Sequence, residues 1–169
     1  MSDTPEVWLR GPIPGIPPLL QPVAHALLQC RAEVEVTVTG LTPDELWQRP
    51  ASVAAAAYHV RHAMGSLDRL FTYARGEQLS RVQLAALAKE GDVNDPPNNG
   101  PDLAQAFEAA VERALAQLRA TPEAALLEAR GVGRAQLPST VLGLLFHAAE
   151  HTQRHVGQLV TTAKIVRAA

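Results

Sequence analysis

Apolar residues recur every three or four positions along four stretches of this chain, the spacing that places them on one face of an α-helix. The stretches cover residues 18–37, 52–75, 102–120 and 139–166. The third is the most regular, and its apolar positions are Leu103, Phe107, Ala110, Val111, Ala114 and Leu118. The pattern predicts four long helices that bury their apolar faces against one another.

Residue types that begin and end helices flank these stretches. Ser52 and Ser139 stand where the N-caps of the second and fourth helices are expected, and Gly76 stands where the second should end. Gly143 and Gly157 fall inside the fourth stretch. A glycine inside a helix costs roughly 1 kcal/mol relative to alanine, so we expect both to allow close approach of a neighbouring helix.

Two shorter helices are predicted between the long ones. Residues 42–45 (Thr-Pro-Asp-Glu) match a capping box with proline at the first helical position, and residues 80–90 also have a helical pattern. Residues 33–38 alternate as a strand would, but no partner strand is evident nearby, so we expect helix there. We expect residues 131–137 to form a loop. Two-stranded elements near residues 33–39 and 132–137 are an alternative, but we do not expect a sheet.

The chain begins with a proline- and glycine-rich arm over residues 1–17, which the helices follow. Its apolar residues, which we expect to pack on the helices, are Trp8, Leu9, Ile13 and Ile16. The predicted fold class is all-α, with one domain over residues 1–169. The predicted architecture is an up-down-down-up type four-helix bundle with additional short helices and the irregular arm.

Composition narrows the choice of partners. The chain has 169 residues and a net charge of −2, which gives no electrostatic case for nucleic-acid binding. No apolar run approaches about 18 residues, and the polar N-terminus lacks the basic start of a signal peptide. Cys30 is the one cysteine, so no internal disulfide can form. We therefore expect a cytoplasmic protein that binds neither nucleic acid nor membrane.

Three of the six histidines lie four residues apart in the fourth stretch, at His147, His151 and His155. Four residues turn a helix by about 400°, so consecutive members lie roughly 40° apart on one face. Neutral imidazole is a common metal ligand, and two at positions i and i+4 can hold one divalent ion. The segment therefore predicts half of a metal site, whose third ligand must come from elsewhere.

The second helix carries two further candidates, His59 and His62, about one turn apart. Spacing leaves the choice open: the pair on the fourth helix is His147 with His151 or His151 with His155, and the third ligand is His59 or His62. Any such set of three leaves coordination positions for water or substrate.

A second motif overlaps the first. Residues 147–151 match H-x-x-E-H, the inverted metalloprotease signature in which the glutamate, here Glu150, is the general base. So short a pattern arises easily by chance in a histidine-rich helix, and the chain is small for a metalloprotease. We therefore do not favour this interpretation. His62, His147 and Glu150 nevertheless remain candidate pocket residues.

Three motifs carry a resemblance to a known family. Residues 151–158 (His-Thr-Gln-Arg-His-Val-Gly-Gln) resemble the H-x-x-x-H-x-G-Q signature of the DinB-like (YfiT-like) superfamily. Ser52, followed seven residues later by His59, resembles its helix-two motif, and residues 41–47 resemble the short helix before that motif. The match spans roughly residues 18 to 166.

The resemblance implies a four-helix bundle that binds a divalent metal, most often zinc or nickel, with ligands His59, His151 and His155. Many relatives are dimers, so the resemblance also implies a homodimer. Relatives with known activities include transferases and isomerases that use a low-molecular-weight thiol such as mycothiol, bacillithiol or glutathione. The implied partner is therefore a small-molecule substrate.

Three functions follow from these observations. The first is a metal-dependent transferase that joins a low-molecular-weight thiol to a small electrophile, with the thiol supplied from outside because we expect Cys30 to lie in the core. The second is a hydrolase that uses metal-bound water, with Glu150 and His147 as candidate bases. The third is a non-catalytic metal-binding protein of the stress response.

Overall fold

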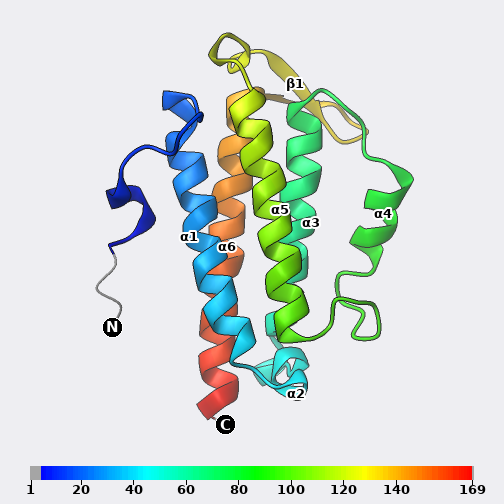
Figure 1. The fold of residues 1–169 in the computed structure, drawn as a ribbon. Coiled ribbons are helices and arrows are strands. Elements are labelled where there is room, and N and C mark those ends of the chain that lie inside the picture. Colours follow the sequence, from blue (N-terminus) through cyan, green and yellow to red (C-terminus); the bar gives the residue numbers. More distant parts are fainter. Residues whose placement is uncertain (1–4, 169) are drawn as a thin grey trace.

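The computed structural model describes residues 5–168, and it is mostly helical, as predicted. The four long helices are α1 (Gln21–Thr39), α3 (Ala56–Ala74), α5 (Gly100–Ala120) and α6 (Val141–Ala168), shown in Figure 1. Two short helices are α2 (Pro43–Trp47) and α4 (Arg81–Ala88), and a hairpin joins β1 (Ala129–Val132) to β2 (Leu137–Thr140). Single 3-10 turns lie at Val7–Arg10, Pro18–Leu20, Pro50–Ser52 and Glu123–Ala125. None of the helices within residues 5–168 has the length and apolarity needed to cross a membrane.

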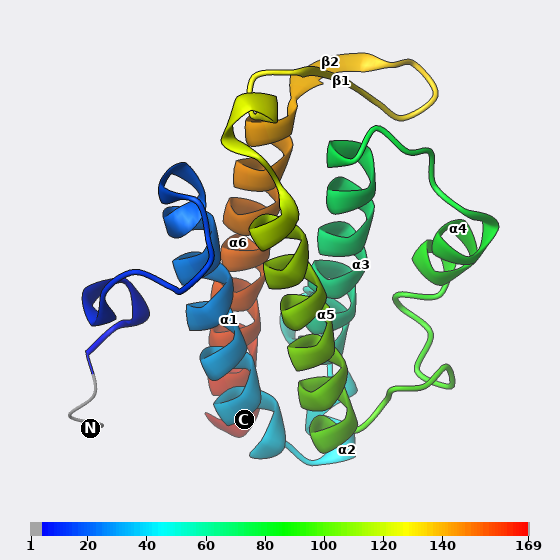
Figure 2. The ribbon, with the colours of Figure 1, turned by 45° about the horizontal axis from the view of Figure 1, so that its top comes forward.

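The long helices pack side by side. Each of α1 and α3 contacts both α5 and α6, and the contact between α3 and α6 is the most extensive in the molecule. Helices α1 and α6 run in one direction, while α3 and α5 run in the other (Figure 1). Figure 2 shows α4 standing apart from the long helices, and none of its residues is buried.

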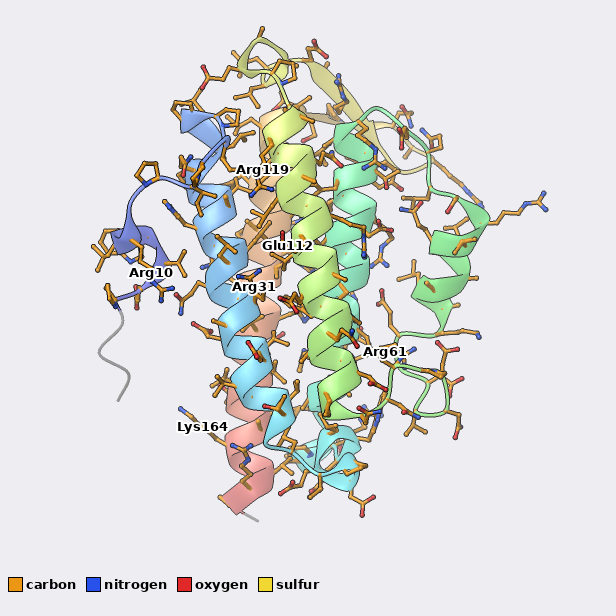
Figure 3. All side chains as sticks on the ribbon, in the orientation of Figure 1. Arg10, Arg31, Arg61, Glu112, Arg119 and Lys164 are labelled. Carbon is orange, nitrogen blue, oxygen red and sulfur yellow. The ribbon has the colours of Figure 1, made fainter. Side chains whose placement is uncertain are left out.

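The apolar faces meet in one continuous core. The predicted apolar positions of α5 are all buried there, and Phe107 and Leu103 are completely inaccessible. Burial of this surface stabilises the fold by about 25 cal/mol for each Å² removed from water. Charged residues remain at the rim, where Arg31 on α1 meets Glu112 on α5 at 2.6 Å (Figure 3).

The predicted N-caps of two long helices are wrong. Helix α3 begins at Ala56, and Ser52 does not cap it, because Ala51 and Ser52 adopt left-handed backbone conformations (φ 48° and 64°) in a separate 3-10 turn. Helix α6 begins one residue later than predicted: the hydroxyl of Thr140, not Ser139, accepts the hydrogen bond from the Gly143 N–H at 3.0 Å.

The strand-like segment of α1 is helical, as predicted. Val34 and Val38 lie one turn apart on the face that meets the core, and both are fully buried. Helical spacing therefore explains their burial, and the alternation with charged residues is incidental.

The expectation of no sheet is wrong for the connection between α5 and α6. Strands β1 and β2 pair in antiparallel register, from Ala129 with Thr140 to Val132 with Leu137. The turn depends on left-handed conformations at Gly133 and Gln136. The sequence pattern does not favour these strands, because they are short and half-exposed and apolar residues do not alternate along them.

The arm over residues 1–17 packs only in part, and its residues 1–4 lie outside the described structure. Ile16 is buried and Ile13 packs against the core, as predicted. Trp8 and Leu9 are instead more than half exposed, at 61% and 57%.

The predicted role of the two glycines in α6 is wrong. A Cβ added at Gly157 would meet no atom within 4 Å, and one at Gly143 would meet only the side chains of Ser139 and Thr140 just before the helix. Close approach of two helices is found instead at Gly100, where a Cβ would collide with the backbone carbonyl of Val38.

Candidate metal centre

Helices α3 and α6 bring four histidines together. His59 and His62 lie on α3, and His151 and His155 lie on α6. Because each pair is spaced by one turn, the extensive packing of α3 on α6 places both pairs in one layer. Imidazoles from two separate stretches of the chain therefore lie close together, as the sequence predicted.

Three of these rings converge. One nitrogen from each of His62, His151 and His155 can be chosen so that all three lie within 4.8 Å of one another. The Nε2 atoms of His62 and His151 are 3.1 Å apart. The ring centroid of His155 lies 4.5 Å from that of His62 and 4.6 Å from that of His151. Nitrogen donors at such separations could share a single cation.

His59 touches the same cluster from a different side. Its Nδ1 lies 3.1 Å from Nδ1 of His155, and its side chain is buried. Of the two candidates on α3, His62 is therefore the one whose nitrogen converges with both α6 histidines, and His59 contacts His155.

The surroundings favour neutral imidazoles, the form that binds metal. Burial, which has the largest effect, acts together with the neighbouring His62, His151 and His59 to lower the pKa of His155 to about 4. Burial also lowers the pKa values of His151 and His59, with His62 adding to both shifts. Burial thus favours the neutral form of all three rings.

The buried carboxylate of Glu90, which sequence analysis missed, contacts His62. Glu90 lies just after α4, and its Oε2 is 2.7 Å from His62 Nδ1 while its Oε1 accepts a hydrogen bond from Arg69 at 2.7 Å. Burial opposes ionisation of Glu90, but the hydrogen bonds from His62 and Arg69 outweigh it and lower its pKa. No spacing rule links positions 62 and 90, so only the fold could reveal this contact.

A hollow of about 540 Å³ adjoins the cluster. Its lining is mostly apolar and aromatic, and it consists of Trp47, Arg49, Ala54, Ala55, Tyr58, Gly91 and Val93. The Tyr58 ring stacks on His62, with centroids 5.6 Å apart and planes 15° from parallel. A small molecule in this hollow would therefore contact Tyr58, the residue whose ring stacks on His62.

The two other candidate pocket residues on α6 make contacts with each other. His147 is half exposed, and its Nδ1 lies 2.6 Å from Glu150 Oε1. Glu150 also accepts hydrogen bonds from Arg154 at 2.7 and 2.9 Å. The hydrogen bonds from Arg154 are the main reason that the pKa of Glu150 is lowered, and the slight burial of this carboxyl opposes them.

Comparison with known proteins yields one family. The model of the DinB superfamily matches residues 26–159, which is most of the chain and includes all four clustered histidines. No curated protein matches the sequence.

Proposed function

This chain belongs to the DinB superfamily, and from that premise we propose that it binds one divalent metal through His62, His151 and His155 and transfers a low-molecular-weight thiol to a small electrophile. The observation that carries the proposal is the convergence of three imidazole nitrogens within 4.8 Å. We also propose that the four long helices form an up-down-down-up four-helix bundle.

The residues present fit a divalent metal. Three imidazoles suit zinc or nickel, and they leave coordination positions for another ligand. The family resemblance of the sequence points to His59 as the α3 ligand, whereas the short approach of His62 Nε2 to His151 Nε2 favours His62. We propose His62 as the ligand and His59 as a neighbour that holds the ring of His155.

The chain itself offers no thiol nucleophile at this site. Cys30 lies in the core, as predicted, and burial raises the pKa of its thiol to about 12, so it stays protonated and inaccessible. The nucleophile would therefore be a thiol from solution. A bound divalent ion would supply the lowered thiol pKa that makes thiolate available at neutral pH.

The neighbouring hollow provides a place for the electrophile. Trp47 and Tyr58 are the aromatic residues of its lining, which also includes Arg49. The indole N–H of Trp47 donates to the carbonyl of Asn98 at 3.1 Å, which fixes the orientation of its ring. This lining favours a flat, apolar acceptor over a strongly charged one.

The test begins with metal content. Purified protein is loaded with zinc or nickel, freed of excess ion and examined by elemental analysis, and about one ion per chain is expected. The loaded protein is then incubated with a halonitroarene and, separately, glutathione, mycothiol or bacillithiol. In the expected reaction the thiol sulfur forms a C–S bond, the halide leaves with the bonding electrons, and the thiol proton passes to the buffer.

Two histidine variants show whether thioether formation depends on the metal site. His155→Ala should abolish thioether formation, whereas His25→Ala should not, because His25 lies on α1 and contacts the carbonyl of Gly11. Inactivity with every thiol would argue against the transferase. Cleavage of an ester or amide without thiol would instead favour the hydrolase, although Glu150, already held by Arg154, is poorly placed as its base.

A further inference from the structure

We infer that Glu90 is a positioning residue for the metal centre, which acts by fixing the tautomer and orientation of His62; this inference rests on the proposed metal site. Glu90 does not itself converge with the three histidine nitrogens. Its effect would pass through the imidazole of His62, whose two nitrogens face in different directions toward Glu90 and His151.

The first step of the argument is the tautomer. An ionised carboxylate can only accept hydrogen bonds, so Nδ1 of His62 must donate to Glu90 across their 2.7 Å contact. Donation from Nδ1 leaves Nε2 with its lone pair in the neutral ring. Nε2 is the atom that lies 3.1 Å from His151, so the Glu90 contact presents a metal-binding lone pair to the cluster.

The second step is that Glu90 is itself held. Its side chain is only 8% exposed, and its other oxygen accepts from Arg69, whose side chain is 12% exposed. Both carboxylate oxygens are therefore used, one for each partner. A buried carboxylate with this anchoring holds its oxygen against His62 with little freedom to rotate.

The third step is the space made for this pair by Gly65, one turn before Arg69 on α3. A Cβ added at Gly65 would overlap both the Glu90 carboxylate and the Arg69 guanidinium. Alanine is otherwise the better helix former at such a position. The glycine is explained if the Glu90–Arg69 pair must lie against the helix there.

The segment that carries Glu90 has a second, separate attachment that serves as a control. Arg61 on α3 donates to the Asp92 carbonyl at 2.6 Å and pairs with Asp95 at 2.8 Å, on the side of α3 that faces this loop (Figure 3). Removal of the Asp95 charge would loosen the loop without touching a histidine. It therefore separates general loop anchoring from the specific effect of Glu90.

The experiment measures zinc affinity by competition with a chromophoric chelator in wild type, Glu90→Ala, Glu90→Gln and Asp95→Asn. Loss of a carboxylate behind a metal-ligating histidine typically weakens affinity about 10- to 100-fold. We expect that loss for Glu90→Ala and partial rescue by Glu90→Gln, whose amide oxygen can still accept from Nδ1. We expect Asp95→Asn to stay within about twofold of wild type.

A spectroscopic readout tests the mechanism directly. Nitrogen-15 NMR of histidine-labelled protein, without metal, should show His62 as the Nδ1–H tautomer in wild type and as a mixture of tautomers in Glu90→Ala. Circular dichroism of each variant checks that the helices remain. Gly65→Ala is a second route to the same defect: it should lower zinc affinity while helicity is kept.

The outcomes separate the inference from the proposed function. If wild type binds zinc and His151→Ala does not, but Glu90→Ala binds as tightly as wild type, the metal site stands and the role of Glu90 is wrong. If Asp95→Asn weakens binding as much as Glu90→Ala does, Glu90 merely anchors the loop and the inference also fails. If wild type binds no divalent metal, both proposals fall together.

Discussion

The Nε2 atom of His62 on α3 lies 3.1 Å from the Nε2 atom of His151 on α6, although 89 positions separate the two residues in the chain. Two lone pairs cannot face each other at this distance without repulsion, so a proton or a cation must lie between them. His62 already donates from its other nitrogen to Glu90. A proton on one of the two nitrogens satisfies this contact, and so does a cation bound by both. The following measurements test the proposed cation.

Removal of His151 should remove the metal but not the fold. His151→Ala takes away one of three proposed ligands, while the buried apolar faces that supply most of the stability remain intact. We expect elemental analysis to fall from about one ion per chain to near zero, with the far-ultraviolet circular dichroism spectrum unchanged. Global unfolding of this variant would indicate a structural metal site instead.

The two candidate ligands on α3 can be told apart by parallel substitution. His62→Ala should lower zinc affinity at least as much as His151→Ala does, because its nitrogen converges with both α6 rings. His59→Ala should lower affinity less, because His59 contacts only one member of the converging set, His155, at 3.1 Å. The reverse order in a chelator competition would restore the ligand set that the family resemblance implied.

Cys30 should be unreactive in the folded protein. Burial, with a smaller contribution from the nearby Glu33 carboxylate, raises the pKa of its thiol from 9.0 to about 12. Because the folded pKa exceeds the unfolded one, the resulting contribution to stability is fully present below about pH 9 and is lost as the pH rises toward 12. Between pH 7 and 8, labelling by an alkylating reagent should therefore be limited by the rate of unfolding. Rapid labelling of native protein would contradict the buried position.

The core side chain Leu27 and the exposed side chain Val36, both on α1, form a matched pair for stability. Leu27 is completely buried, so Leu27→Ala should lower the free energy of unfolding by about 2–5 kcal/mol. Val36 is 76% exposed, so Val36→Ala should change it by less than about 0.5 kcal/mol. Urea denaturation measures both, and equal effects would contradict the assignment of the core face.

Two helical glycines should respond to alanine in opposite directions. Gly157→Ala should raise the free energy of unfolding by roughly 0.5–1 kcal/mol, since the new methyl group meets no neighbour and alanine is the better helix former. Gly100→Ala should lower it by about 1–3 kcal/mol, because the methyl group would press on the backbone of Val38, which cannot move aside as a side chain could. Destabilisation by Gly157→Ala would mean that a neighbour packs there.

Local patterns in the sequence were sufficient for several features whose physical cause is itself local, although the N-caps expected at Ser52 and Ser139 were wrong. The capping box at Thr42 and Glu45 forms as predicted, because both partners lie three residues apart and need no other part of the fold. The alignment of His151 and His155 on one face of α6 follows in the same way from the helical repeat. The long helices and the buried face of α5 were predictable on these grounds.

Tertiary structure decided what depends on residues distant in the chain. His59 and His62 lie about one turn apart on α3, so only the packing of α3 against α6 determines which ring meets His151. Glu90 reaches His62 through a loop whose path no periodicity encodes. The sequence alone predicted the helices and the faces on which their histidines lie, because helical periodicity is a local property. Only the packing of separate elements in three dimensions brought these side chains together into a site.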